Sequence, residues 1–507
     1  MKNKMKNIIK NIVILVLFSV VFTGCDDYLD VNTPSDAQNV DDLNMKDIMG
    51  PVMLNTIYGN YYAEVYFGNY TQYFGSYGSG AAGLTSASTT WSNIYTRVLP
   101  NITVIESKAN AQGAKHYEAV AKILESINMS FAVESWGDVP YEQATQPFKY
   151  PNPELEDGEQ VYSKAMSLLN EAITALESDD PSLIGMGKED LIYNGDYDKW
   201  LRAAYTFKAR MQLKMMKNGG TSANDVLASI ANGFTSNGDD MKLFFPEGKI
   251  NPYYSTNILS RNTHNFFRAP NDQLITMMNG KTYPFEGGVV NIDPRLPAIF
   301  ENEGAEGDPW RGFMNGGTGE SSDIEDDSDP ADIIYYPANT YYKDGGYYTK
   351  ENSPLILITY AEAMFIKAEA AFLANGGTTT SIGSSADAYA AYMEGISANM
   401  NAVGVSGSDY MSDPVVAVGE TGLMLNHIMK EKYIANIHNT ETFSDMRRYN
   451  FSNDVFKGLE LRLEEDSESE YTGLWFRRAI YPLSEADTNS NINQDEATSV
   501  KSVWLFE

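Results

Sequence analysis

The sequence predicts a mainly α-helical protein, in which tetratricopeptide-type helix pairs form a scaffold and a large loop-rich half contains short strands. Apolar residues recur at helical spacing in segments of about 15 to 20 residues. Alanine and aromatic residues occupy the interior positions of these segments, and the middle of the chain is rich in Gly, Asn, Asp and Pro. A generic helical bundle is the alternative, because insertions interrupt the units and no strict period survives.

The helical scaffold is expected over residues 43–231 and 355–450, with the loop-rich insertion over about 232–354. A loop of this length inside a compact protein usually carries function. Helices are expected from the periodicity at 43–57, 91–105, 117–131, 162–176, 197–216, 223–231, 355–374, 386–402 and 422–436.

The N-terminal segment predicts a lipoprotein signal peptide over residues 1–24. Four lysines precede an apolar run from Ile12 to Phe22, which is about half the length that a membrane-spanning helix needs. Thr23 and Gly24 then precede Cys25, the only cysteine, and this pattern resembles the lipobox of bacterial lipoproteins. Cys25 is therefore the predicted lipidation site, and several acyl chains on it would anchor the protein durably. An ordinary secretory signal ending near a chance cysteine is the alternative.

The mature chain, residues 25–507, is predicted to be one acidic domain. The whole chain carries a net charge of −31, and loss of the four signal-peptide lysines leaves −35. Such a charge excludes nucleic acid as a partner and disfavours polyanionic ligands, because both need clustered basic residues. One cysteine allows no intramolecular disulfide, so the stability must come from a core. No linker of useful length divides the helical segments.

Aromatic residues are the compositional signal of this chain, with 33 Tyr, 22 Phe and 6 Trp. Tyrosine offers a flat apolar face with a hydroxyl rim and loses little entropy when it is fixed, which suits stacking on sugar rings. More than half of the tyrosines are expected simply to pack. Three doublets lie in the loop-rich half, and in a strand one member of each would be anchored while the other faces solvent; these are Tyr335-Tyr336, Tyr341-Tyr342 and Tyr347-Tyr348.

Catalytic and metal-binding motifs are largely missing from the sequence. The four histidines form no metal-binding pair, and the chain has neither a nucleophile elbow nor a P-loop. The alternating acids Asp323, Glu325, Asp327 and Asp329 resemble the start of a calcium loop. Ser328 and Ile334 replace the required Gly and Glu, so a solvated acidic loop is the better interpretation and no cofactor is expected, with bound calcium as a minor alternative.

An ordered series of motifs over the mature chain resembles the SusD/RagB family of nutrient-binding outer-membrane lipoproteins. The motifs follow Cys25 in the order Leu29-Asp30-Val31 with Pro34, Trp91 with Tyr95 and Asn101, residues 136–141, Asp293-Pro294-Arg295-Leu296, Pro354 with residues 360–363, residues 445–449, and residues 481–485 with Asn489 and Asn493. Most of them are expected to serve the fold. Asp293 to Arg295 and Asp445 to Arg448 are interpreted as buried or half-buried ion-pair and turn elements, and Trp136 as packing at a helix corner.

This resemblance implies a non-catalytic lipoprotein on the outer face of the outer membrane. It would capture oligosaccharides and pass them to a partner TonB-dependent transporter barrel (SusC-like). Two alternatives stay open: the same architecture with peptides as cargo, and a surface glycoside hydrolase with a deep cleft and two convergent carboxylates. The candidate ligand-binding residues are Tyr73, Tyr77, Trp91, Trp310, Arg311, Tyr336 and Tyr342, with Arg311 as a hydrogen-bond donor.

Overall fold

The computed structural model describes residues 5, 43–75, 84–246, 248–265, 268–282, 288–290, 292–314, 319–325, 334–461, 471 and 473–507, with the backbone alone at 320, 322–325 and 334–335. The chain divides into two units, Met1–Asn44 and Met45–Glu507. All elements named below belong to the second unit. The predicted signal-peptide boundary after residue 24 lies outside the described residues.

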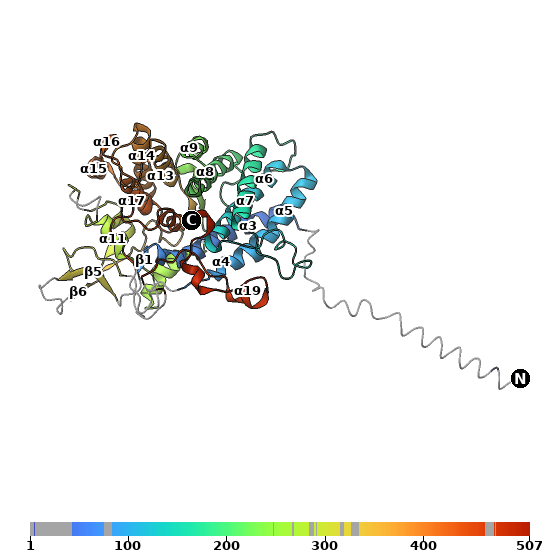
Figure 1. Ribbon diagram of the computed structural model, residues 1–507, viewed down its shortest axis with the longest axis horizontal. Coiled ribbons are helices and arrows are strands. Elements are labelled where there is room, and N and C mark those ends of the chain that lie inside the picture. Colours follow the sequence, from blue (N-terminus) through green and yellow to red (C-terminus); the bar gives the residue numbers. More distant parts are fainter. Residues whose placement is uncertain are drawn as a thin grey trace. The chain divides into compact units, whose positions relative to one another are not determined.

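Helices that pack in sequence order build the scaffold (Figure 1). Helix α6 packs against α5 and α7, α8 packs against α7 and α9, and α13 packs against α9, α14 and α17. This succession of neighbouring helices is the tetratricopeptide-like arrangement that the sequence predicts. The longer helices are α3 (Met45–Tyr70), α5 (Leu99–Gln112), α6 (Lys115–Trp136), α7 (Gly158–Leu176), α8 (Tyr197–Met215), α9 (Ala223–Ile230), α13 (Tyr360–Ala374), α14 (Ala386–Val403), α17 (Leu425–Ala435) and α18 (Glu441–Arg448).

Local sequence signals account for several helix ends. Asp157 caps α7, because its carboxylate accepts hydrogen bonds from the backbone N–H groups of Glu159 and Gln160. Ser222 and Asp225 form a reciprocal capping box at the start of α9. The helix expected at 91–105 is continuous from α4 (Ser88–Ser92) through the π-helical turn η2 (Asn93–Val98) into α5.

Residues 355–358 correct the predicted helix at 355–374. Leu355–Ile358 is strand β8, which pairs antiparallel with β2 (Met241–Leu243). The helix α13 begins only after Thr359, whose hydroxyl accepts a hydrogen bond from Glu362 N at 3.1 Å. A short continuous apolar run fits a buried strand as well as a buried helix. The apolar pattern of α13 follows almost directly, so the sequence gives no sign of where the strand ends and the helix begins.

The loop-rich half contains short strands and turns, as predicted. Besides β2–β8, the antiparallel pairs are β1–β3, β4–β7 and β5–β6. Strands β5 and β6 lie side by side in Figure 1. Their bounds are β1 (Phe74–Gly75), β3 (Ala269–Pro270), β4 (Phe300–Asn302), β5 (Glu320–Glu325), β6 (Ile334–Pro337) and β7 (Thr340–Tyr342). Shorter helical elements are η3 (Met216–Asn218), η4 (Asn237–Asp239), η5 (Tyr254–Leu259), α10 (Ser260–Asn262), α11 (Asp272–Met278), α12 (Leu296–Ile299), α15 (Ser408–Ser412), α16 (Gly419–Gly422), α19 (Leu483–Thr488), η6 (Glu496–Val500) and η7 (Trp504–Phe506).

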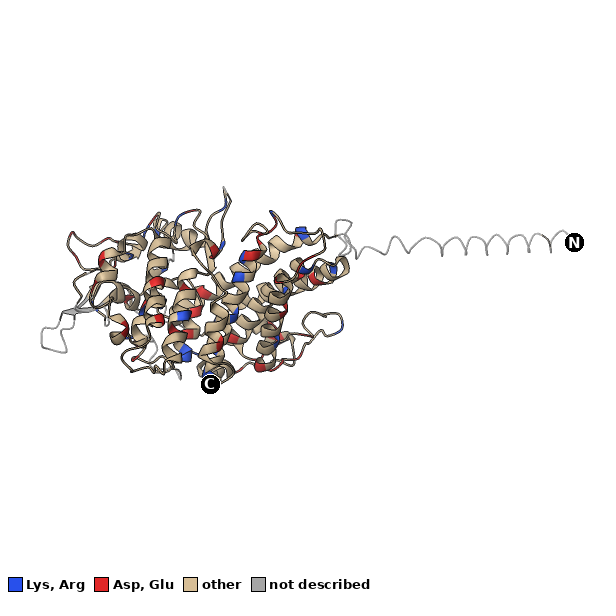
Figure 2. Ribbon diagram, turned by 90° about the horizontal axis from the view of Figure 1, so that it is seen from above, with Lys and Arg blue, Asp and Glu red and all other residues tan. Residues whose placement is uncertain are grey.

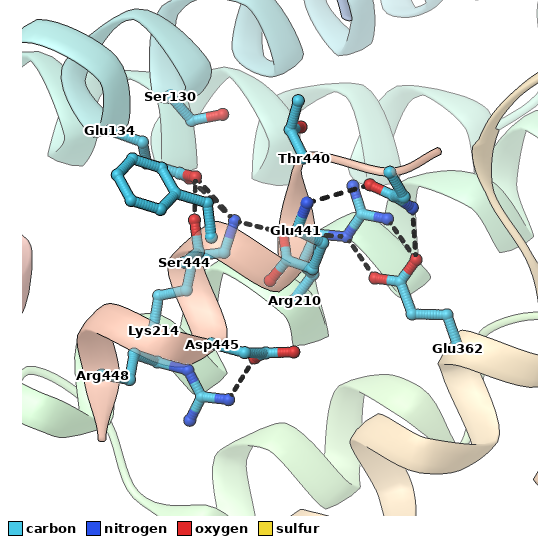
Figure 3. A network of polar contacts seen from close by, with 12 residues as sticks. Ser130, Glu134, Arg210, Lys214, Glu362, Thr440, Glu441, Ser444, Asp445 and Arg448 are labelled. Carbon is cyan, nitrogen blue, oxygen red and sulfur yellow. Dashed lines mark hydrogen bonds and ion pairs between the residues drawn. The ribbon is translucent and has the colours of Figure 1, made fainter. Parts of the chain in front are cut away.

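Charged side chains pair inside the scaffold, where acidic and basic positions are interspersed along the packed helices (Figure 2). Lys214 on α8 contacts Glu134 at 2.8 Å and Glu441 at 2.7 Å, and Arg210 contacts Glu362 at 2.6 Å (Figure 3). All five side chains are buried, so each charge needs the others to offset its lost hydration. The network ties α6, α8, α13 and α18 together.

Candidate ligand-binding site

Arg311 and two half-buried aromatic residues, Tyr336 and Trp310, are neighbours in the loop-rich half. The Arg311 guanidinium carbon lies 4.7 Å from the centre of the Tyr336 ring. Tyr336, on β6, and Trp310, next to Arg311 in the chain, are both half-buried. A guanidinium against an aromatic face is a favourable cation–π contact, and it restricts both side chains. These three residues, which the sequence picked out as ligand-binding candidates, therefore lie together.

Asn339 holds the segment that carries Trp310 and Arg311. Its side-chain oxygen accepts a hydrogen bond from Arg311 N at 2.9 Å, and its side-chain nitrogen donates to Pro309 O at 2.9 Å. The backbone N–H groups of Asn339 and Thr340 both donate to Arg311 O, at 3.1 and 3.0 Å. Asn339 is buried, so these bonds are shielded from water. The start of strand β7 thereby fixes the backbone that carries the two candidates.

Tyr341 is the aromatic residue of this region that the sequence reasoning missed. It is half-buried on β7, with its ring 5.2 Å from Phe313 and the Arg261 guanidinium 5.1 Å from its centre. Arg261 is in turn ion-paired with Glu301. We call Trp310, Arg311, Tyr336 and Tyr341 the Trp310 cluster.

In the Tyr341-Tyr342 doublet one ring is buried and the other is half-buried, as strand alternation predicts. The buried ring belongs to Tyr342, the residue predicted to bind ligand, which the structure therefore corrects. Tyr342 is 1% exposed and packs 5.0 Å from Phe300 on β4, the strand that pairs with β7. The second doublet, Tyr347-Tyr348, lies in a turn and not in a strand, although Tyr348 is buried and Tyr347 is half-buried. Strand alternation predicts that one ring of a doublet is buried, but which of the two is buried depends on the tertiary packing.

Tyr73 and Trp91 are also core residues, so the predicted ligand contacts do not fit their burial. Tyr73 is 0% exposed, stacks on Tyr433 at 4.6 Å and donates its hydroxyl to Tyr433 O at 2.6 Å. Trp91 is 3% exposed and lies edge-on to Trp136 at 5.1 Å. A covered ring offers a sugar no face, and both residues serve packing between segments that are distant in sequence.

The remaining predicted site residues fall wholly or partly outside the described residues. Cys25, Tyr77, Asp327 and Asp329 lie outside them, and Asp323 and Glu325 are on β5 without described side chains. Within the part of the chain that the structure describes, no group of three or more His, Cys, Asp or Glu side chains is arranged to hold a metal ion.

A separate cleft of about 490 Å³ lies among α5, α6, α7 and the segment after α6. Glu106 and Glu125 both line it, and each influences the pKa of the other. Burial, followed by the charge of Glu125, raises the pKa of Glu106 to about 8, so the pair shares a proton near neutral pH. Tyr141 donates its hydroxyl to Glu125 at 2.7 Å.

The buried ion network borders a smaller cavity of about 40 Å³. Glu134, Arg210, Lys214 and Glu441 line it together with Thr, Asn and Ser side chains. Burial raises the pKa of Glu441 to about 7, although Lys214 and Arg210 oppose that shift. Apolar side chains such as Ile127 and Phe207 line it as well, and a space of this size is too small for a sugar ring. The Trp310 cluster is therefore the better ligand-binding candidate.

Comparison with known proteins identifies the family. The family model described as "Starch-binding associating with outer membrane", SusD-like, matches residues 38–471. The chain belongs to the SusD-like family. No curated protein matched it, whereas solved structures match along nearly their whole length.

The structural neighbours of this SusD-like protein share its fold at low identity. A SusD/RagB family protein from Bacteroides thetaiotaomicron is 20% identical with a TM-score of 0.68, and the match covers 91% of this chain and 99% of that one. A chitin-binding SusD homologue from Flavobacterium johnsoniae is 19% identical with a TM-score of 0.69, covering 91% and 98%. A further chitin-binding protein is 21% identical with a TM-score of 0.69, covering 91% and 100%.

Three of the sequence motifs that resemble the family meet in one packed corner. Trp136 is fully buried and donates its indole N–H to Ser86 O at 3.1 Å, which confirms its predicted packing role. Trp91 contacts both Trp136 and Tyr481. The Tyr481 hydroxyl donates to Asp138 O at 2.8 Å. These three motifs, which are far apart in the sequence of the SusD-like protein, therefore pack against one another.

The Asp293 to Arg295 motif is a buried ion cluster, as predicted. Arg295 contacts Asp293 and Glu431 at 2.6 Å each, and all three side chains are buried. Burial by itself would raise the pKa of Glu431, but Arg295 and Lys430 outweigh it and lower that pKa to about 2.

Asp445 to Arg448 form a second such cluster, in which Arg448 bridges Asp445 at 2.5 Å and Glu369 at 2.7 Å.

Among the described residues, the SusD-like protein has no helix long and apolar enough to cross a membrane.

Proposed function

We propose that this SusD-like protein binds nutrient oligosaccharides at the Trp310 cluster and delivers them to a partner TonB-dependent transporter without cleaving them. The observation that carries the proposal is the cluster itself. It combines the half-buried Tyr336 ring, which lies against the Arg311 guanidinium, with two further half-buried aromatic residues, Trp310 and Tyr341, near backbone that buried Asn339 holds by hydrogen bonds. Flat apolar faces bounded by hydrogen-bond donors suit the apolar faces and hydroxyl edges of sugars.

The charge of the protein favours uncharged sugars over polyanions. Arg311 lies against Tyr336, and Arg261 is already paired with Glu301 and lies 3.6 Å from Glu303. The chain as a whole carries a net charge of −31. A uronate or sulfated chain would therefore meet net repulsion with few unneutralised cations to offset it. Two structural neighbours are described as chitin-binding, and chitin fragments are uncharged.

Attachment to the outer face of the outer membrane through acylated Cys25 completes the proposal. The family model associates its members with the outer membrane. A tether lets the binding domain stay beside its transporter, which raises the effective concentration of captured ligand at the barrel. Mass spectrometry of the protein extracted from membranes should show acyl chains on Cys25. An unmodified N-terminus further along the chain would contradict the anchoring.

Isothermal titration calorimetry tests the binding. Chitotetraose, maltotetraose, cellotetraose and an oligogalacturonate of equal length form the panel, and an uncharged member is expected to bind. Trp310→Ala and Tyr336→Ala should each weaken that binding at least about tenfold, since central aromatic contacts commonly contribute more than about 1.4 kcal/mol. Trp504→Ala is the matched control, because Trp504 is also a half-buried tryptophan but lies in η7 at the C-terminus.

Three results would contradict the proposal. Silence across the whole panel, with peptides found on the purified protein by native mass spectrometry, would favour peptide cargo. Equal weakening by Trp310→Ala and Trp504→Ala would remove the site. Chromatography of the bound oligosaccharide after long incubation should return it at its original length, and shortened products would show hydrolysis.

A further inference from the structure

His438 lies in the turn between α17 and α18 and is 5% exposed. Its φ angle is 66°, in the left-handed region that few residues other than glycine adopt. Neither ring nitrogen makes a hydrogen bond within the described part of the chain. A buried, conformationally strained and poorly hydrogen-bonded side chain persists only where its surroundings fix it strongly.

Aromatic rings from several segments enclose His438. The Tyr253 ring stacks on it at 3.8 Å with an interplanar angle of 26°, and the Tyr342 ring lies at 5.1 Å with the same angle. Tyr348 lies edge-on at 5.2 Å, and Phe74 lies at 5.6 Å. Tyr253, Tyr342 and Tyr348 belong to the loop-rich half, whereas His438 belongs to the scaffold. The imidazole therefore joins the two parts through ring contacts.

Glu64 on α3 secures the same junction from the scaffold side. Its Oε1 lies 3.4 Å from His438 Nδ1, and its Oε2 accepts a hydrogen bond from the Tyr253 hydroxyl at 3.0 Å. Glu64 is 1% exposed, so both contacts are shielded from water. One carboxylate thus lies beside the imidazole and accepts a hydrogen bond from a tyrosine whose ring stacks on it.

The junction continues through β7 to the Trp310 cluster. Tyr342, which faces His438, is the last residue of β7, and Tyr341 of the cluster precedes it. At the start of β7, Thr340 N donates to Arg311 O at 3.0 Å. A displacement of Tyr342 therefore also moves Tyr341 and Thr340 on the same strand, and through the hydrogen bond of Thr340 it moves the backbone of Arg311.

We propose that His438 is a positioning residue for ligand binding: its stacked ring holds β7 against the scaffold and thereby sets the geometry of the Trp310 cluster. His438 is buried beneath the loop-rich half and does not itself touch the ligand. The effect on affinity rests on the proposed glycan binding, whereas the effect on β7 does not. Substitutions along such packed networks change coupling by about 0.5–2 kcal/mol, or between about 2- and 30-fold in affinity.

Hydrogen exchange of the whole chain tests the placement of β7, with His438→Asn as the perturbation. Asparagine tolerates a left-handed backbone but removes the ring. The amides of residues 340–342 should exchange at least about tenfold faster, while those of α6 and α7 keep their rates. His264→Asn is the matched control, since His264 also has a positive φ, 57°, but is exposed; it should change neither set of amides.

His438→Phe separates the ring from the nitrogens. It keeps a ring to stack, and Phe451, with a φ of 53°, shows that phenylalanine can adopt this left-handed backbone in the same fold. Exchange at 340–342 should therefore stay within about twofold of wild type, and glycan affinity should follow. Unchanged exchange in His438→Asn, equal acceleration in α6, or a His438→Phe variant as loose as His438→Asn would each overturn the proposal. If wild-type protein bound no glycan, the proposed function would fail, and the exchange rates would still decide the role of His438.

Discussion

Glu106→Gln should change the pH dependence of stability, because Glu106 and Glu125 share a proton between α5 and α6. The pKa of Glu106 is raised from 4.5 to about 8, so the native state holds this proton where the unfolded chain has lost it. The contribution of Glu106 to the free energy of unfolding is therefore fully present below pH 4.5 and is lost as the pH rises to 8. The full shift corresponds to about 5 kcal/mol, and partial exposure of the side chain reduces this to roughly 2–3 kcal/mol.

Urea denaturation of wild type and Glu106→Gln at half-unit steps from pH 5 to 9 provides the measurement. Other carboxyl groups titrate as well, so the difference in unfolding free energy between the two proteins is the quantity to follow. It should move in favour of the variant by about 2–3 kcal/mol over this range, since glutamine cannot ionise. Glu171→Gln, in the same cleft but leaving the pair intact, should keep the wild-type slope. Parallel curves for wild type and Glu106→Gln would refute the shared proton.

Three further predictions concern the scaffold and the Trp310 cluster. Arg295→Leu leaves buried Asp293 without its ion-pair partner and removes one of the two cations beside Glu431, so it should cost about 3–5 kcal/mol by urea denaturation, against at most about 1 kcal/mol for Lys501→Leu at an exposed pair. A Cβ on Gly312 would lie 2.6 Å from backbone atoms of α11, so Gly312→Ala should displace the cluster and weaken glycan binding in calorimetry, whereas Gly185→Ala, in open space, should not. Trp136→Ala should lower stability by about 3–5 kcal/mol, measured by thermal or urea unfolding.

The sequence predicted the scaffold well because packing there follows local periodicity. Helices α6 and α7 carry apolar residues at i, i+3, i+4 and i+7. Asp157 caps the start of α7, and Gly113 ends α5 with a φ of 68°. At 355–358 the same apolar pattern was ambiguous. Strand β8 forms because β2, more than one hundred residues earlier in the chain, offers an edge to pair with, and no local signal contains that partner.

The candidate site was predictable in kind and only partly in detail. Tyrosine doublets and Trp310-Arg311 indicated an aromatic surface in the loop-rich half, and the Trp310 cluster lies there. Composition could not separate Tyr73, which stacks on Tyr433, from Tyr341, which is half-buried beside Phe313. The difference arises from β-strand pairs and ring contacts between segments that are separated in sequence, by 360 residues for Tyr73 and Tyr433, and a single sequence does not display them.

Helix α18 explains how a scaffold can hold a strained turn under an irregular half of the protein. All eight of its residues are buried, although it is rich in charge, so hydrophobic periodicity could not find it. Its charges are paired with α8, α13 and α17. The turn before it is fixed by two hydrogen bonds: Asn439 donates to Glu362 at 3.1 Å and Thr440 to Asn60 at 2.7 Å. Because directional bonds fix the residues after His438, its left-handed backbone is maintained at a position where apolar packing alone would allow it to relax. The same buried charges that make the helical scaffold rigid therefore also determine where β7, and with it the Trp310 cluster, can rest.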